Sequence, residues 1–411
     1  MLTRICGMLV VTITITIGCG ANNDHNTPDA LVQSDAPLAD APNGNQSGMV
    51  AIPLVGLGGG YTAKLQFGTQ LFDVIVDTGS TSTGVAASTC TNCAVQPEYL
   101  TTAAVDQHQT ATSQYGSGSW KGEVFEDSAT MGGRQPVMLD FASITSQTNF
   151  FQGPGFQGIL GLGPDGLLLP HTTSYLTKLI AAGMTAEVAF QLCPDSGTMW
   201  LGGHDAAAAT APPSFTPMLS SAPYYMVGVG GASVNGGAAL TGADFGPTII
   251  DTGTTLTFVP TAVETAIVSG VSGSSGYTQV FGSQALSDGA CLNTTMTSTQ
   301  IDAALPPFSL SFAGATAISI PATRSYLFDQ GGGQYCFTFS DSSALFGSAQ
   351  KVSLFGNTLL AGMLTVVDVA NHQIGFAPQN GCAEASFAHR PVVIRPPSMA
   401  PAWRAGQVTV Q

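Results

Sequence analysis

The chain has 411 residues, enough for two domains that each bury a core of their own. Charged residues make up 9% of it, hydrophobic residues 44%, and 50 residues are glycine, a composition that favours mostly β structure with many turns. The net charge is −15, and residues 50–382 hold only six basic side chains, so no basic patch exists for a phosphate backbone and nucleic acid is excluded as a partner. The acidity favours solubility outside the cell, with tolerance of acid as the alternative interpretation.

The N-terminus predicts export. Arg4 precedes an apolar stretch from Ile5 to Ile17, which is too short for a membrane span of about 20 residues and is typical of a secretory signal. Gly18-Cys19 resembles the end of a bacterial lipoprotein signal, in which the cysteine is acylated, while an ordinary signal peptide is the alternative. Residues 1–19 are therefore predicted as a signal peptide and residues 20–48, poor in apolar side chains, as a disordered tether. We expect a protein anchored by lipid at the cell envelope or surface, or alternatively secreted.

The most informative feature of the sequence is a strand followed by a turn that carries an aspartate, which occurs twice. The triplet Asp-Thr-Gly occurs twice, at residues 77–79 and 251–253, each time after a short apolar run that predicts a buried strand ending in a tight turn. Two matching units predict two similar lobes, each supplying one carboxylate. Two carboxylates at one site cannot both ionise cheaply, so they share a proton, and one can act as a base on water while the other acts as an acid.

Between and after these units the sequence predicts further strands and short helices. Residues 114–120 alternate glycine with small polar residues after an aromatic one, which is typical of a movable hairpin tip. Residues 158–163 form an apolar run in which glycines allow close approach of another backbone. Helices are expected at 175–182 and near 261–269, a lobe junction at 206–217, and a strand at 225–229 before an Asn235-Gly236 hairpin turn. The match of residues 161–166 to G-x-G-x-x-G lacks a surrounding βαβ unit and predicts no nucleotide site.

Six of the 8 cysteines lie beyond the signal, and an even number in an exported chain favours disulfides. Cys90 and Cys93 have the spacing of half a zinc site. No second pair and no histidine at ligand spacing follows them, so a small disulfide loop is favoured over a metal. No metal site and no cofactor is predicted.

Six ordered motifs resemble those of the pepsin-like aspartic peptidases, and they cover about residues 50–382. The resemblance implies an all-β, bilobed pepsin-like fold with the active-site cleft between the lobes. With the lobe junction in the Ala- and Pro-rich stretch 206–217, we expect an N-terminal lobe at 49–214 and a C-terminal lobe at 215–382. The Pro- and Arg-bearing segment 383–411 has no periodicity and is expected to be a flexible tail. The six motifs are Phe67-Gly68-Thr69 with Asp77-Thr78-Gly79-Ser80; Tyr115-Gly116-Ser117-Gly118; Gly158-Ile159-Leu160-Gly161-Leu162-Gly163; Asp251-Thr252-Gly253-Thr254-Thr255; Leu354-Phe355-Gly356-Asn357 with Val366-Val367-Asp368; and Ile374-Gly375-Phe376-Ala377.

The resemblance also implies a role for each matching residue. Asp77 and Asp251 would be the catalytic pair that holds the attacking water. The support residues would be Thr78 and Thr252, which lock the turns together, Gly79 and Gly253, which let the carboxylates approach, and Ser80 and Thr254, which bond to the carboxylates. The substrate-binding residues would be Tyr115, Gly116 and Ser117 of a closing flap, with Ile159 in the wall of an apolar pocket. The disulfides would be Cys90–Cys93, Cys291–Cys336 and Cys193–Cys382.

Three positions depart from the family pattern. Gly84 falls where the family has the tryptophan that pairs with the flap tyrosine, which predicts a looser flap. Gln157 replaces an aspartate before the Gly-Ile-Leu strand. Residues 20–48 are acidic and do not resemble the family's basic inhibitory prosegment.

These observations predict an exported aspartic endopeptidase, of bacterial origin and monomeric, that acts on peptide or protein substrates with a preference for apolar residues at the cut. The alternative is a catalytically weak or inactive pepsin-like protein that binds or inhibits other proteins at the cell surface, and a structural cell-surface protein is a third class. Inactive members usually lose an active-site aspartate, a turn glycine or the flap, whereas this chain keeps them all.

Overall fold

The structure is a computed structural model that describes residues 48–116, 118–151, 155–220, 222–234 and 239–382. The chain divides into two units, Met1–Pro42 and Asn43–Gln411, and all described residues belong to the second. The predicted signal, tether and tail, Cys19, Ser117 and the Asn235-Gly236 turn lie outside the described residues. Within those ranges, no helix combines the length and the hydropathy that a membrane crossing requires.

Strands dominate the fold, and helices are short. The strands are β1 Val50–Gly56, β2 Tyr61–Phe67, β3 Gln70–Asp77, β4 Gly84–Ala86, β5 Val105–Gln114, β6 Ser119–Thr130, β7 Val137–Thr148, β8 Gly158–Gly161, β9 Glu187–Leu192, β10 Ser196–Leu201, β11 Ser214–Pro217, β12 Met226–Val234, β13 Leu240–Thr241, β14 Pro247–Ile250, β15 Thr257–Val259, β16 Cys291–Asn293, β17 Phe308–Phe312, β18 Ile318–Ile320, β19 Leu327–Gly331, β20 Gln334–Phe337, β21 Phe339–Asp341, β22 Ser353–Phe355, β23 Met363–Asp368 and β24 Gln373–Pro378. The α-helices are α1 Tyr175–Ala181, α2 Gly242–Phe245, α3 Thr261–Ser272, α4 Tyr277–Phe281, α5 Ser298–Ala304, α6 Ser343–Phe346 and α7 Asn357–Leu360. The all-β, bilobed expectation is therefore confirmed.

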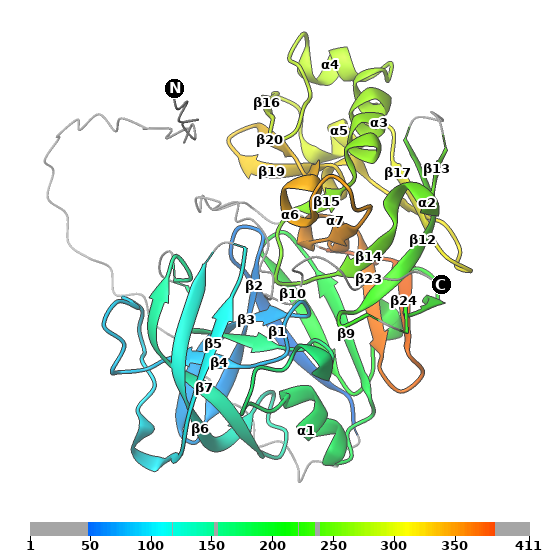
Figure 1. Cartoon of the computed structure of the whole chain (residues 1–411). Helices are drawn as coiled ribbons and strands as arrows, with labels where there is room; N and C mark the ends of the chain where they lie inside the picture. The colour runs from blue at the N-terminus through cyan, green and yellow to red at the C-terminus, as the bar shows by residue number, and fades with distance from the viewer. Residues whose placement is uncertain (1–47, 117, 152–154, 221, 235–238, 383–411) are drawn as a thin grey trace, which may run out of the picture. The chain divides into compact units, whose positions relative to one another are not determined.

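The largest sheet joins the two ends of the described chain. Its 13 strands run in the order β11-β24-β23-β9-β10-β1-β2-β3-β8-β4-β7-β6-β5. The C-terminal strands β23 and β24, orange in Figure 1, thus join a sheet whose other strands all end by Pro217. A second sheet contains β12, β14, β15, β17 and β22, and a three-stranded sheet contains β16, β19 and β20.

The two Asp-Thr-Gly strands occupy equivalent places in the two large sheets. β3 pairs in parallel with β8, with Asp77 opposite Gly161, and β14 pairs in parallel with β22, with Ile250 opposite Phe355. Glycine is required where each partner strand ends, at Gly161 of β8 and at Gly356 directly after β22. A Cβ on Gly161 would lie 2.3 Å from the Thr81 carbonyl carbon, and one on Gly356 would lie 2.2 Å from the Leu256 carbonyl oxygen. The predicted close approach of backbones at residues 158–163 is therefore present.

The predicted helices are present with small differences in length. Ser174 caps α1 by accepting a hydrogen bond from the Thr177 N–H. α3 begins at Thr261 as expected but continues to Ser272, because its buried row of Val263 and Ile267 extends to Val271 before Gly273. β12 likewise runs beyond the expected strand, to Val234, since it pairs with β17 across a bulge.

The disulfides join Cys90 to Cys93, Cys291 to Cys336 and Cys193 to Cys382, which are the three pairs implied by the family resemblance. The pair Cys193–Cys382 closes the longest loop, with a sequence separation of 189. It fixes the end of β9 to the segment that follows β24, so it cross-links two strands of the largest sheet that lie on either side of β23.

Replacing both Cys193 and Cys382 with Ser should lower the free energy of unfolding by about 4–5 kcal/mol, because the cross-link restricts a very long loop in the unfolded chain. The matched control is the pair Cys90→Ser and Cys93→Ser, whose loop has a sequence separation of 3 and should cost about 2 kcal/mol. Denaturant unfolding of both variants checks this, and equal losses would contradict the loop-length explanation.

Candidate active site

Each aspartate of the repeated triplets is held by its own turn in the same way. The backbone N–H of Gly79 donates to Asp77 Oδ1 at 2.7 Å, and Ser80 Oγ donates to Asp77 Oδ2 at 2.5 Å. In the second turn the Gly253 N–H donates to Asp251 Oδ1 at 2.8 Å, and Thr254 Oγ1 donates to Asp251 Oδ2 at 2.5 Å. The spacing of Asp, Gly and Ser or Thr therefore gives each carboxylate one donor per oxygen.

Two threonines fasten the two turns to each other. The Thr78 N–H donates to Thr252 Oγ1 at 3.1 Å, and the Thr252 N–H donates to Thr78 Oγ1 at 3.0 Å. Each hydroxyl then donates across to the opposite strand, Thr78 to the Ile250 carbonyl at 2.8 Å and Thr252 to the Val76 carbonyl at 2.9 Å. Because all four bonds are buried and reciprocal, they fix the distance between the carboxylates.

Glycine allows the two carboxyl groups to come together. A Cβ on Gly79 would lie 2.6 Å from Asp251 Oδ1, and one on Gly253 would lie 2.2 Å from Asp77 Oδ1. These contacts are shorter than any side chain tolerates, so each turn leaves room for the opposite aspartate only because it lacks a Cβ. The carboxyl groups themselves are in hydrogen-bonding contact.

Burial raises the pKa values of Asp77 and Asp251, so the two carboxyl groups retain a proton between them. Asp77 and Asp251 are 0% and 1% exposed. Burial raises the pKa of Asp77, and the bond from Ser80 partly opposes this rise. Burial also raises the pKa of Asp251, well above its usual value, and the charge of Asp77 adds to it. The proton therefore belongs on Asp251 when Asp77 is ionised, because two adjacent buried carboxylates cannot both carry charge.

Tyr115 of the β5–β6 hairpin lies beside this pair. It is 4% exposed, its hydroxyl contacts the hydroxyls of Ser80 and Ser113, and its ring stacks on Phe150 with centroids 5.3 Å apart. Burial raises the pKa of its phenol, and the charge of Asp77 adds to the rise. The hairpin closes at the bond from the Tyr115 N–H to the Gly118 carbonyl, and Gly116 is exposed at its tip.

Tyr115 has an indole partner although Gly84 stands where the family has its tryptophan. Trp120 Nε1 donates to the Tyr115 hydroxyl at 3.2 Å, from the beginning of β6. A Cβ on Gly84 would already lie 3.4 Å from Trp120 Cζ2, so the indole ring covers the position where the family tryptophan was missing.

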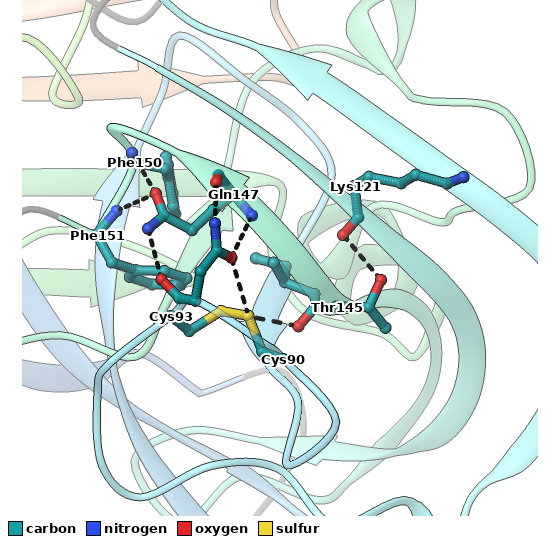
Figure 2. Close-up of a disulfide and its surroundings, with 9 residues drawn as sticks. Cys90, Cys93, Lys121, Thr145, Gln147, Phe150 and Phe151 are labelled. Carbon is teal, nitrogen blue, oxygen red and sulfur yellow. Dashed lines mark hydrogen bonds between the residues drawn. A yellow bond between two sulfur atoms is a disulfide. The ribbon is translucent and has the colours of Figure 1, made fainter.

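Phe150 is supported by a polar contact chain that begins at a disulfide. Figure 2 shows Gln147 between the Cys90–Cys93 disulfide and the backbone of Phe150 and Phe151. The Gln147 side chain accepts from both of these N–H groups, at 2.8 and 3.2 Å, and donates to the Asn92 carbonyl at 2.8 Å. The loop closed by Cys90–Cys93 is therefore docked on the strand that leads to the aromatic partner of Tyr115.

The remaining predicted positions have clear structural surroundings. Ile159, on β8, is buried in one cluster with Tyr115, Trp120, Phe150 and Phe156. Gln157, the residue that replaces an aspartate, accepts from the Asp73 N–H at 2.8 Å and donates its own N–H to the Asp73 carbonyl at 2.7 Å. The neutral side-chain amide of Gln157 thus provides an acceptor for the Asp73 N–H of β3 without adding a buried charge. Among the described residues, no three His, Cys, Asp or Glu side chains gather to hold a metal ion.

Asn357 belongs to one of the six motifs, but the sequence analysis gave it no role at the site. Its side-chain Nδ2 donates to the Thr252 carbonyl at 2.8 Å and to the Gly59 carbonyl at 2.9 Å. It therefore links the second aspartate turn to the β1–β2 turn. Its place directly after Leu354-Phe355-Gly356, in a repeat of the first lobe's Gly-Leu-Gly segment, was the available signal.

Comparison with known proteins agrees with this geometry. The family model described as eukaryotic aspartyl protease matches residues 60–379. An aspartic protease of Phaffia rhodozyma is 31% identical over 326 residues, which cover 77% of this chain and 76% of the relative. Gastricsin of Cavia porcellus is 26% identical, covering 79% and 82%, and pepsin-2B of Gadus morhua is 24% identical, covering 77% and 95%.

Two structurally equivalent aspartate turns, locked together in a two-lobed β fold, define an aspartic peptidase. The chain belongs to the eukaryotic aspartyl protease family, the pepsin-like aspartic peptidases, and is an aspartic-type endopeptidase with peptides or proteins as substrates. These relatives come from eukaryotes and give no support to the expected bacterial origin.

Thr252→Val should destabilise the fold by about 1–3 kcal/mol, because it keeps the side-chain volume but leaves the buried Thr78 N–H without its acceptor. The matched control is Thr365→Val on β23. Thr365 is 1% exposed, and its hydroxyl has no hydrogen-bond partner among the described residues, so its removal should be neutral or slightly stabilising. Denaturant unfolding measures both, and a harmless Thr252→Val would contradict a structural role for the threonine pair.

Proposed function

We propose that this chain is an exported endopeptidase in which Asp77 and Asp251 activate one water molecule between them. The single observation that carries the proposal is the buried pair of carboxyl groups, in contact and held by the same hydrogen bonds in two equivalent turns. Neither a covalent intermediate nor a cofactor is part of the proposal. In this proposal Asp77 is the ionised member and Asp251 the protonated one, because burial and the charge of Asp77 both raise the pKa of Asp251.

Ionised Asp77 takes a proton from the water as the water oxygen attacks the carbonyl carbon of the scissile bond. Protonated Asp251 gives its proton to the carbonyl oxygen, which produces a tetrahedral diol. The proton held by Asp77 then moves to the leaving nitrogen as the carbon–nitrogen bond breaks, and the diol returns a proton to Asp251. Ser80 and Thr254 stabilise whichever carboxylate is charged, because each donates to an outer oxygen.

The aromatic cluster beside the pair supports a preference for apolar residues on both sides of the cut. Tyr115 and Ile159 belong to this cluster, and an apolar side chain buried against them gains about 1.5–3 kcal/mol. Gly116 at the hairpin tip, together with Ser117, would bond to the substrate backbone and exclude water. Nothing in the geometry favours the alternative of an inactive binding protein, since both aspartates and both turn glycines are in place.

Asp77→Asn or Asp251→Asn alone should abolish peptide hydrolysis while the fold stays intact, and the double variant should be no worse than either single one, because the pair acts as a unit. The measurement is digestion of a mixed peptide library at several pH values, with sequencing of the products. We expect cuts between apolar residues, a bell-shaped pH profile and no effect of chelators. Turnover by the double variant, or cuts confined to charged residues, would contradict the proposal.

The raised pKa of Asp251 also predicts how stability depends on pH. In the unfolded chain an aspartate titrates near pH 3.9, so between about pH 4 and the higher folded value the folded state binds more protons than the unfolded state. This part of the stability is complete below pH 4 and is lost as pH rises through the folded pKa. Asp251→Asn, which imitates the protonated group, should therefore be more stable than the parent at pH 7 and show a flatter stability profile.

We further propose that the N-terminus exports the chain and anchors it through lipid on Cys19. Tether residues 20–48 could extend roughly 3.3 Å per residue from the membrane, and each buried CH₂ of an acyl chain contributes about 0.8 kcal/mol to attachment. Lobes at 49–214 and 215–382, a flexible tail and a monomeric state complete the proposal.

Cys19→Ser should move the protein from the membrane fraction to the soluble exported fraction, while Cys6→Ser, inside the signal, should leave it in the membrane fraction. Cell fractionation followed by immunoblotting measures both. If parent and Cys19→Ser proteins are equally soluble outside the cell, the lipid anchor is wrong and secretion is the correct alternative.

A further inference from the structure

Asn92 continues the sheet at the edge of β7 that β4 leaves open. β4 pairs with β7 only along Ala142–Ile144. Further along β7, the Asn92 side chain accepts from the Gln147 N–H at 3.1 Å and donates to the Gln147 carbonyl at 2.7 Å. Asn92 lies inside the short loop that the Cys90–Cys93 disulfide closes. A side chain of this loop thus satisfies both backbone groups of Gln147, as a neighbouring strand would.

The side chain of Gln147 carries this connection beyond the end of β7. Its Oε1 accepts from the N–H groups of Phe150 and Phe151, and its Nε2 donates to the Asn92 carbonyl (Figure 2). A neutral carboxamide has both the acceptor and the donor that these contacts need, whereas a carboxylate has no donor and an ammonium no acceptor. Since β7 ends at Thr148, the Gln147 amide fixes two N–H groups that lie past the strand.

Phe150 and Phe151 form a wall of aromatic rings beside Tyr115. The Phe150 ring stacks on Tyr115 with centroids 5.3 Å apart, and it meets the Phe151 ring edge-on at 4.9 Å. Phe156 completes the wall, 5.5 Å from Phe151 and 6.0 Å from Phe150 between ring centroids. All three phenylalanines are buried. Because one oxygen of Gln147 holds the N–H groups of two of them, a shift of that oxygen moves the rings that flank Tyr115.

We propose that Gln147 is a positioning residue, which sets the places of the Phe150 and Phe151 rings and through them the size of the apolar side chain that the enzyme prefers. The Cys90–Cys93 loop takes part in this selection, because its Asn92 holds Gln147. The inference rests on the proposed function, in which the aromatic cluster receives an apolar side chain next to the cut. It gives that preference a cause outside the rings themselves.

Gln147→Met tests the proposal, because it keeps the length of the side chain and removes its acceptor and its donor. Two peptides that differ only in Phe or Ala before the cut are compared. KM should rise about threefold to tenfold for the Phe peptide, the effect of losing one hydrogen bond, and stay unchanged for the Ala peptide. Gln147→Glu retains an acceptor and should restore part of the selectivity. Equal changes in kcat/KM for both peptides, which a purely structural role predicts, overturn the proposal.

Gln284→Met is the matched control. Gln284 is half-buried like Gln147, and its side chain likewise accepts from a backbone N–H and donates to backbone carbonyls. Its loss should lower stability and leave the ratio of the two kcat/KM values unchanged.

Asn92→Ala tests the part assigned to the loop. It should change the ratio of the two kcat/KM values in the same direction as Gln147→Met, and the two changes together should add nothing to Gln147→Met alone, because both act through one contact. An unchanged ratio in Asn92→Ala overturns the proposal for the loop. If Gln147→Met does not fold, Asn92→Ala and Gln147→Glu decide.

Hydrogen exchange separates this inference from the proposed function. In protein with ¹⁵N-labelled phenylalanine, the Phe150 and Phe151 amides should be protected in the parent and lose that protection in Gln147→Met. The Phe376 amide, within the paired strand β24, should stay protected. If the parent hydrolyses no peptide but this change occurs, the proposed function fails and the positioning of the two rings stands. Unchanged exchange at both amides refutes the role of Gln147 even in an active enzyme.

Discussion

The structure depends on one unfavourable interaction, the repulsion between the two buried carboxyl groups of Asp77 and Asp251 when both are ionised. The surrounding contacts hold the two groups together despite this repulsion. Removing an aspartate from water is costly, and a second negative charge beside it raises that cost further. This cost is offset because the two carboxyl groups share one proton and each carboxyl oxygen accepts one hydrogen bond. Four further hydrogen bonds, made by Thr78 and Thr252, hold the two turns together. Each turn follows a strand that is held in a parallel pair, β3 with β8 and β14 with β22.

Much of this arrangement follows from local spacing, which is why it could be predicted. The glycine two residues after each aspartate and the hydroxyl three residues after it reach the same carboxylate in any such turn. Repetition of the turn predicted two lobes, and the apolar runs before it predicted the buried strands. The helix at residue 175 was also expected within one residue of its observed end.

Contacts between distant residues could not be predicted in the same way. The bond from Asn357 to Gly59 joins positions 298 residues apart, and no periodicity encodes it. Gly84 alone indicated a missing partner for Tyr115, because a sequence shows an absent side chain but not which neighbour fills the space. Trp120 was visible in the hairpin motif, yet only the pairing of β7 with both β4 and β6 brings its ring next to Gly84.

The order of strands in the largest sheet has a consequence for synthesis of the chain. β9 lies between β10 and β23, so its second neighbour is made only after about 175 further residues have left the ribosome. Until then the edge of β9, which carries the buried Val188 and Phe190, presents unpaired N–H and carbonyl groups. The first lobe is thus a nascent domain with an open edge, which other chains can pair with. The edge is covered only when β23, near the C-terminal end of the described chain, pairs with β9. A chain that stops before β23 therefore keeps that edge exposed.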